Sequence, residues 1–186
     1  IFDKESLSSE QMANYDFTRW TDDNPDGWLV VGESGSDPMV TQVSGGARLY
    51  TSGAAVAVQQ ATMQLGKLYK VIVDIDTVTV GGVRLQNDSI IIDNNISTVG
   101  VRTYYIIGGA SNEVLKLIRK DVALPNDIII RSFSLKEVLS PNKSLIPPEL
   151  WPQLAGDEEL VDTNSQNFQT TIGDWGIYRT GTTPLG

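Results

Sequence analysis

The side chains best suited to chemistry in this sequence form an oxygen-rich stretch near the N-terminus. Its candidate metal ligands are Asp22, Asn24, Asp26 and Glu33. Together with Gly27, their spacing fits the calcium-loop pattern D-x-N-x-D-G-x5-E, in which alternate oxygens and a Gly bend surround a hard cation. Pro25 stiffens this stretch, and residues 28–31 read as a strand rather than an exit helix. The pattern therefore leaves two interpretations, a calcium site and an acidic β-turn, and we expect no other cofactor.

Two further carboxylates, Asp74 and Asp76, are spaced to lie on one face of a strand, about 7 Å apart. Paired carboxylates can hydrolyse glycosides, although a charge pair on a solvated strand face is far commoner. The sequence contains no His and no Cys, so the commonest general base and the usual Ser-His and Cys-His arrangements are missing. We therefore expect a protein that is not an enzyme.

The overall charge narrows the choice of partners. The formal net charge is −9, and the 14 Lys and Arg residues are scattered along the chain. Such a surface repels phosphate backbones, so we expect no nucleic-acid partner. No apolar run is long enough to cross a bilayer, so we also expect no membrane insertion.

The pattern from Leu29 onward is typical of an all-β fold. Short runs rich in Val, Ile, Thr and Tyr alternate with Gly, Asn, Asp and Ser at the spacing of a sandwich or barrel. The expected strands are residues 28–32, 39–43, 46–51, 54–63, 68–78, 82–86, 89–93, 99–107, 113–119 and 127–138.

Two of these runs make specific predictions about burial. In residues 68–78, Val71, Val73, Ile75 and Thr77 alternate with Lys70, Ile72, Asp74 and Asp76, which predicts one face on the core and one in water. Residues 103–107 are apolar on both faces, which predicts a central strand.

Composition also divides the chain into parts. Residues 1–16 are polar and predict a short helix or an extended arm, with the arm itself assigned to residues 1–14. A sandwich domain is expected over residues 15–138. Residues 139–157 are Pro-rich and predict a linker. Residues 158–186 then predict the start of a second, similar module.

A sequence motif that occurs twice supports this division into modules. Phe17 and the sequence Asp26-Gly27-Trp28 have a counterpart in Phe168 and Gly173-Asp174-Trp175. Trp175 follows Trp28 by 147 residues, which is about one sandwich domain plus a linker. The repeat predicts one complete module followed by the opening of another.

The order of several motifs resembles a known family. Phe17, Trp20, the turn Asp26-Gly27-Trp28, the start Gly66-Lys67-Leu68-Tyr69 and the closing run Phe133-Ser134-Leu135-Lys136-Glu137-Val138 follow one another. Together they resemble the carbohydrate-binding jelly rolls of families 4 and 9, which recur in bacteriophage virion proteins. The resemblance implies a two-sheet antiparallel jelly-roll sandwich in which Phe17 and Trp28 are core residues. Arg131 stands where this family often has an Asp beside a structural calcium.

Aromatic side chains are the other route to function, because sugar rings stack on flat Trp and Tyr faces. For a bound glycan we expect Tyr50, Arg102 and Tyr104 to line the concave face. The alternative is that these side chains fill strands or an oligomer interface.

The leading hypothesis is a non-enzymatic structural protein of a bacteriophage virion, a fibre, tail or capsid-surface component. Its sandwich would serve in assembly, as a homo-oligomer and with other virion proteins, or in adhesion to host surface glycans. The alternative is the glycan-binding module of a secreted polysaccharide-degrading enzyme. Repeated modules suit either role, because tandem weak sites gain avidity.

Overall fold

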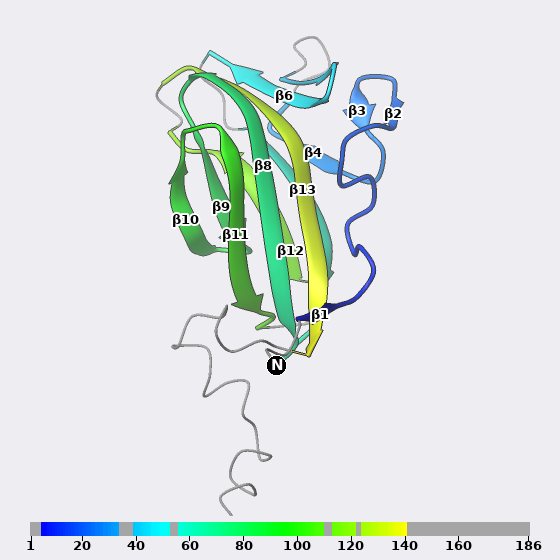
Figure 1. Ribbon diagram of the computed structural model, residues 1–186. Helices are drawn as coiled ribbons and strands as arrows, with labels where there is room; N and C mark the ends of the chain where they lie inside the picture. Colours follow the sequence, from blue (N-terminus) through cyan, green and yellow to red (C-terminus); the bar gives the residue numbers. More distant parts are fainter. Residues whose placement is uncertain (1–4, 34–38, 53–55, 110–112, 122–123, 141–186) are drawn as a thin grey trace, which may run out of the picture. The chain divides into compact units, whose positions relative to one another are not determined.

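The computed structural model describes residues 5–33, 39–52, 56–109, 113–121 and 124–140. These residues form strands and turns and contain no helix, so none that could span a membrane. The strands build a two-sheet antiparallel β-sandwich of the jelly-roll type, as the sequence predicted. Figure 1 shows the two sheets stacked against each other.

The first sheet is built around two long neighbouring strands. Its order is β11 (Gly100–Ile107), β8 (Leu68–Val80), β13 (Asn126–Ser140), β6 (Gly46–Thr51) and β5 (Val40–Val43). The short β1 (Ser6–Leu7) also pairs with β13. Because β6 pairs with only the first part of β13, the second part is left for the N-terminal segment.

The second sheet has the order β10 (Ile90–Ile96), β9 (Val83–Asn87), β12 (Glu113–Arg119), β7 (Ala57–Met63) and β4 (Leu29–Val31). A separate small hairpin joins β2 (Trp20–Thr21) to β3 (Asn24–Pro25). Period-2 alternation is clearest in β12, where Leu115 and Leu117 are fully buried and Val114, Lys116 and Ile118 are only partly buried. This alternation gives the second sheet one face on the core and one outer face.

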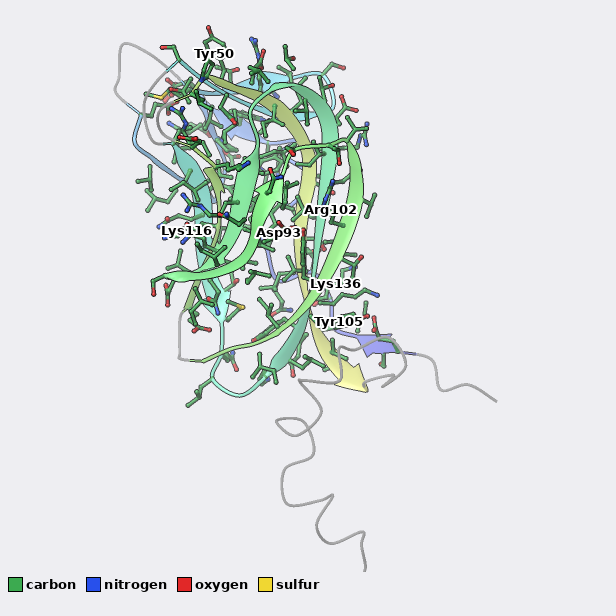
Figure 2. All side chains as sticks on the ribbon, turned by 90° about the vertical axis from the view of Figure 1, so that its left-hand side faces the viewer. Tyr50, Asp93, Arg102, Tyr105, Lys116 and Lys136 are labelled. Carbon is green, nitrogen blue, oxygen red and sulfur yellow. The ribbon has the colours of Figure 1, made fainter. Side chains whose placement is uncertain are left out.

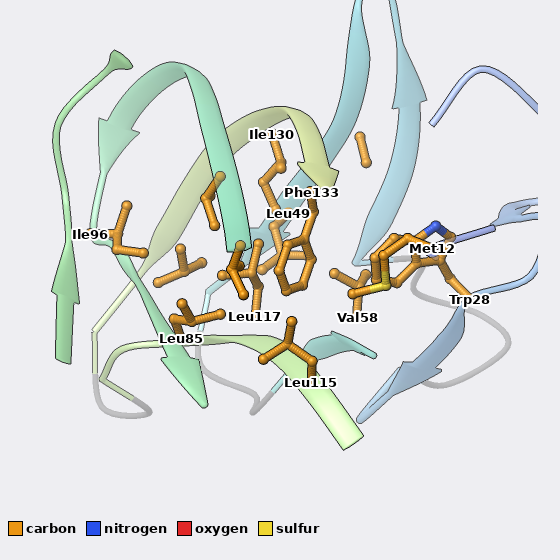
Figure 3. Close-up of a cluster of buried hydrophobic side chains, with 14 of the residues drawn as sticks. Met12, Trp28, Leu49, Val58, Leu85, Ile96, Leu115, Leu117, Ile130 and Phe133 are labelled. Carbon is orange, nitrogen blue, oxygen red and sulfur yellow. The ribbon is translucent and has the colours of Figure 1, made fainter. Parts of the chain in front are cut away.

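The buried core lies between the sheets and extends to the N-terminal segment (Figure 3). Trp28 packs between Phe17, at 5.0 Å between ring centroids, and Phe133, at 5.5 Å. The indole Nε1 of Trp28 donates a hydrogen bond to the carbonyl of Asn14, which satisfies its polar atom inside the core. The expectation that Phe17 and Trp28 are core residues is therefore confirmed.

The alternation expected in β8 holds from Lys70 to Ile75 and then shifts. Val71, Val73 and Ile75 are buried, as predicted. A register irregularity between β8 and β13 follows Ile75, and beyond it Val78 packs against the core. The prediction that Thr77 continues the core-facing row is wrong, because the bulge after Ile75 turns Val78 rather than Thr77 toward the core.

The prediction that residues 103–107 form a central strand is also wrong. β11 pairs with β8 alone among the described strands and is therefore an edge strand. Its inner face packs on the core through Ile106. On its outer face, Glu5 covers the Tyr105 ring tip by accepting a hydrogen bond from its hydroxyl. This explains why residues 103–107 carry apolar side chains on both faces although β11 lies at the edge of its sheet: the core covers one face and Glu5 covers part of the other.

Within the described part of the N-terminal segment, residues 5–16 form strand β1 and turns rather than a short helix. The amides of Ser8 and Gln11 donate to carbonyls of β13, and the amide of Phe133 donates to the carbonyl of Tyr15. The division between an arm at 1–14 and a sandwich at 15–138 stays a prediction. The predicted linker and second module lie outside the described residues, except that β13 continues to Ser140.

Candidate binding surfaces

Charged side chains on the outer face of the first sheet are largely paired with one another. Arg131, at the bulge in β13, contacts both carboxylates of β8, with 2.9 Å between its Nη1 and the Oδ2 of Asp74. Asp74 and Asp76, which we considered as a catalytic pair, therefore act as partners of one guanidinium. This agrees with the commoner interpretation of a solvated charge pair.

Arg48 and Tyr50 form a second paired group on this face. The Nε and Nη2 of Arg48 donate to the two carboxylate oxygens of Asp127 at 2.7 and 2.8 Å, and the guanidinium lies 4.8 Å from the centre of the Tyr50 ring. The hydrogen bond from Arg48 is the main reason that the pKa of Asp127 is lowered. The same hydrogen bond raises the pKa of Arg48.

A third group lies where β8 meets the N-terminal segment. The ammonium of Lys70 is 2.7 Å from the Glu5 carboxylate and lies over the Tyr105 ring at 5.7 Å. Burial, followed by the hydrogen bond to Glu5, raises the pKa of the Tyr105 hydroxyl. The outer face of the first sheet thus uses most of its polar groups internally.

The three residues expected to bind a glycan do not meet. Tyr50 is 47% exposed and lies on the outer face of the first sheet. Arg102 and Tyr104 stand opposite the buried Val73 and Val71, so they lie on the inner side of β11. Figure 2 labels Tyr50 and Arg102 at separate places on the sandwich. A role in glycan binding for any of the three stays a prediction.

Arg102 and Tyr104 have partners within the fold. The Tyr104 hydroxyl donates to Asp93 of β10 at 2.6 Å, which ties together the edge strands of the two sheets. Burial, and then this hydrogen bond, raises the pKa of the Tyr104 hydroxyl. Arg102 donates to the carbonyls of Thr98 and Gly100 at 3.1 and 3.4 Å.

The four candidate calcium ligands lie around the small β2–β3 hairpin and the segment after β4. Asp26 accepts a hydrogen bond from the Thr21 hydroxyl at 2.8 Å. Glu33 accepts from the backbone amides of Met39 and Val40. Asp22 lies in the turn of the hairpin, where it has a positive φ of 57°, and Asn24 begins β3. Within the described residues no three acidic side chains gather as a metal site, and calcium binding stays a prediction.

A groove of about 490 Å³ opens beside the first sheet. Its lining includes Asp16, Thr18 and Gln42, and Arg131 forms part of one wall. Asp16 already accepts a hydrogen bond from the Thr18 hydroxyl at 2.9 Å, and Arg131 is held by the two carboxylates of β8. Few free polar groups are left in this groove for a ligand.

The outer face of the second sheet differs because its polar side chains are unpaired. The strand register places Gln86 of β9, Lys116 of β12 and Gln59 of β7 side by side, and we call them the Gln–Lys–Gln row. None of these three side chains makes a hydrogen bond or ion pair within the described residues. Each can therefore bind a ligand without first losing an internal partner.

Aliphatic side chains extend the Gln–Lys–Gln row at both ends. Leu29 of β4 stands opposite Gln59 and is 58% exposed, whereas Ile91 of β10 stands opposite Gln86 and is 47% exposed. Five neighbouring strands separated by about 4.8 Å make this line about 19 Å long. A shallow depression of about 360 Å³ adjoins it, and its lining includes Leu29, Gln59, Ala61 and Val114.

Our reading of the sequence did not single out this surface. Its signal was present in the alternation of residues 113–119, which leaves Lys116 facing outward between two buried leucines. What the sequence could not supply was the register that brings Gln59 and Gln86 to either side of Lys116. That register depends on pairing between strands that are distant in the chain, such as Lys116 opposite Gln59.

We compared the chain with protein families, with curated proteins and with solved structures. The sequence matches no protein-family model, and it matches no curated protein. Among solved structures, the chain is similar to TmCBM61, a carbohydrate-binding module whose structure was solved in complex with β-1,4-galactotriose. The identity is 12%, the TM-score is 0.44, and the alignment covers 69% of this chain and 98% of that one. Similarity at this level does not identify a ligand for the present chain.

Proposed function

We propose that this sandwich is a non-catalytic module that binds a polysaccharide chain across the outer face of its second sheet. The observation that carries the proposal is the Gln–Lys–Gln row, whose three side chains have no partner within the described residues. On the outer face of the first sheet, by contrast, the charged groups of the described residues are largely paired.

The chemistry of the row suits a sugar polymer. The two Gln amides each donate and accept hydrogen bonds, which matches the dual character of sugar hydroxyls. Leu29 and Ile91 offer apolar contact to the less polar faces of sugar rings. A line of about 19 Å across five strands fits an extended chain better than a compact molecule.

The proposal of a non-catalytic role rests on residue types and pairings. The sequence has no His and no Cys, and the only carboxylate pair that we considered for glycoside hydrolysis is engaged by Arg131. The row itself contains no carboxylate, so it lacks the carboxylate pair that most glycoside hydrolases use.

The setting that we propose is a bacteriophage virion, with the module in a fibre, tail or capsid-surface protein that forms homo-oligomers. The repeated Phe and Gly-Trp phrase supports a chain of similar modules. Tandem copies would gain avidity from individually weak sites, which a row without an exposed aromatic platform needs. The alternative setting is a secreted polysaccharide-degrading enzyme. Flanking repeats of the same module would favour the virion, and a flanking catalytic domain would favour the enzyme.

The test is calorimetry of the 186-residue chain against polysaccharides that a glycan array first selects. We expect Gln59→Ala and Gln86→Ala each to weaken binding about 5- to 10-fold, because each removes about 1 kcal/mol of hydrogen bonding. The matched control is Gln64→Ala in the exposed turn after β7, which should bind like the wild type. Binding to no polysaccharide, or equal losses in all three variants, would refute this function.

A further inference from the structure

The outer face of the second sheet carries positive charge in an acidic protein. The chain has a net charge of −9, yet the face includes two cations, Lys116 and Arg84. The register assigns the following described residues to this face: Leu29, Val31, Ala57, Gln59, Ala61, Arg84, Gln86, Ile91, Val114, Lys116 and Ile118. No carboxylate is among them. The face therefore has a local charge opposite to that of the whole chain.

The two cations differ from Arg48, Lys70 and Arg131 of the first sheet in having no ion pair in the described part of the chain. Arg48, Lys70 and Arg131 each contact a carboxylate oxygen, at 2.7, 2.7 and 2.9 Å respectively. Neither Lys116 nor Arg84 has such a contact within the described residues. The Nε of Arg84 is buried and has no hydrogen-bond partner there. An external anion would supply the acceptor that both side chains lack.

The pairing of β9 with β12 brings these two cations close together. Lys116 stands opposite Gln86, and Arg84 stands opposite Ile118, so the two cations are diagonal neighbours on the same face. Diagonal neighbours on adjacent strands are separated by about 7–8 Å between Cα atoms. Both long side chains can therefore reach one anionic group beside the Gln–Lys–Gln row.

We propose that the polysaccharide bound by this face is acidic, with a sugar carboxylate or sulfate held between Lys116 and Arg84. This inference rests on the proposed function and adds the class of ligand to it. The anion relieves the repulsion between two unpaired cations, and the flanking Gln amides bind neighbouring hydroxyls. A nucleic acid fits less well, because two cations neutralise few phosphates and the rest of the chain repels the backbone.

The experiment compares charged and neutral polymers. The 186-residue chain is titrated with polygalacturonate, which carries carboxylates, with dextran sulfate, which carries sulfates, and with neutral dextran. Lys116→Gln and Arg84→Gln remove one charge each from the second sheet, and Lys136→Gln removes one from the opposite face. Figure 2 shows Lys116 and Lys136 on opposite sides of the sandwich. Circular dichroism verifies that each variant is folded.

We expect binding to one or both acidic polymers and at least about 10-fold weaker binding to dextran. The stronger acidic polymer shows whether the carboxylate or the sulfate is preferred. Lys116→Gln and Arg84→Gln should each weaken the acidic interaction about 5- to 10-fold, and Lys136→Gln should not. Raising the salt from 50 to 300 mM should weaken binding by the wild type more than by either second-sheet variant.

Three results would overturn the inference, and they differ in what they say about the proposed function. Equal affinity for dextran and the acidic polymers would refute the acidic ligand and keep the polysaccharide function. Equally tight binding of poly-L-glutamate, unaffected by Gln59→Ala or Gln86→Ala, would show that the face recognises polyanions, including acidic proteins, by charge alone. Failure to bind any polysaccharide, including those of a glycan array, would refute the function and the inference together.

Discussion

Asn14 connects the N-terminal segment to the core through hydrogen bonds of its side chain and of its backbone carbonyl. Its side chain donates from Nδ2 to the carbonyl of Arg19 at 2.7 Å and accepts from the Arg19 amide at 2.9 Å, and its own carbonyl accepts from Trp28. The residue is buried and has a positive φ of 53°, a conformation that Asn tolerates better than most residues. The side chain and the carbonyl of Asn14 together fix the turn that places Phe17 and Trp28.

Replacing this side chain should cost substantial stability. We expect Asn14→Ala to lower the free energy of unfolding by about 2–4 kcal/mol, because it removes both partly buried hydrogen bonds to the Arg19 backbone, leaves the Arg19 amide without this partner and strains a left-handed residue. Urea denaturation measures the change. Asn94→Ala, at an exposed position in β10, is the matched control and should change stability by less than about 0.5 kcal/mol. Similar losses in both variants would contradict the role of Asn14.

The Arg48–Asp127 pair gives a prediction about pH. Its hydrogen bond lowers the pKa of Asp127 below the ordinary value of 3.8. The folded state therefore holds the carboxylate ionised more strongly than the unfolded state, and the pair stabilises the fold at pH values above that ordinary pKa. This stabilisation is lost as the pH falls through the lowered pKa.

We therefore expect the wild type to lose more stability than Asp127→Asn between pH 5 and pH 2.5. Thermal melting of both proteins across this range measures the difference in Tm. Asp23→Asn, in the exposed hairpin turn, is the control and should follow the wild type. Parallel pH profiles for the wild type and Asp127→Asn would mean that the pair does not contribute to stability.

At the scale of the elements, the close approach of β6 to β13 depends on one glycine. A Cβ at Gly46 would lie 2.1 Å from the carbonyl oxygen of Ile130, which is backbone and cannot move aside cheaply. The neighbouring Gly45 has a positive φ of 90° but open space around its missing Cβ. Gly45 therefore meets a conformational requirement alone, whereas Gly46, with a φ of 153°, meets a conformational and a packing requirement together.

This difference predicts unequal effects of the same substitution. Gly45→Ala should cost about 1–2 kcal/mol of unfolding free energy, because only the left-handed backbone is strained. Gly46→Ala should cost at least about 3 kcal/mol, because β6 must also move away from β13. Chemical denaturation of both variants gives the comparison, and equal costs would contradict the close contact between the strands.

The strands were largely predictable from sequence, because alternating burial and turn-forming residues are local properties. Their bounds in the structure differ from the expected ones by a few residues. The sequence could not predict how the strands pair with one another or which distant residues come into contact. Thr77 leaves the core-facing row because of a bulge. Residues 103–107 belong to an edge strand, and its outer Tyr105 is covered by Glu5, which lies 100 positions earlier. The Gln–Lys–Gln row could not be predicted for the same reason, since its members come from three strands and are aligned only by the strand register.

At the scale of the whole molecule, the two outer faces use their polar groups differently. The first sheet pairs cations with carboxylates across its strands and with Glu5 of the N-terminal segment, which attaches that segment to the sandwich. The second sheet keeps Gln59, Gln86 and Lys116 unpaired between aliphatic ends. Under the proposed function, the first sheet contributes its outer polar groups to stability and the second sheet offers its own to a ligand. A homo-oligomeric assembly and a place in a virion stay predictions for the full protein.

The most direct test of the central claim is a map of the ligand-contacting residues in solution. The amide and Gln side-chain signals of isotope-labelled protein are followed by NMR during titration with polygalacturonate. We predict that the largest shift changes fall on β7, β9 and β12, with the side-chain amides of Gln59 and Gln86 among them. Changes confined to the first sheet around Tyr50, or no changes with this or any other polysaccharide, would contradict the assignment of the second sheet as the binding face.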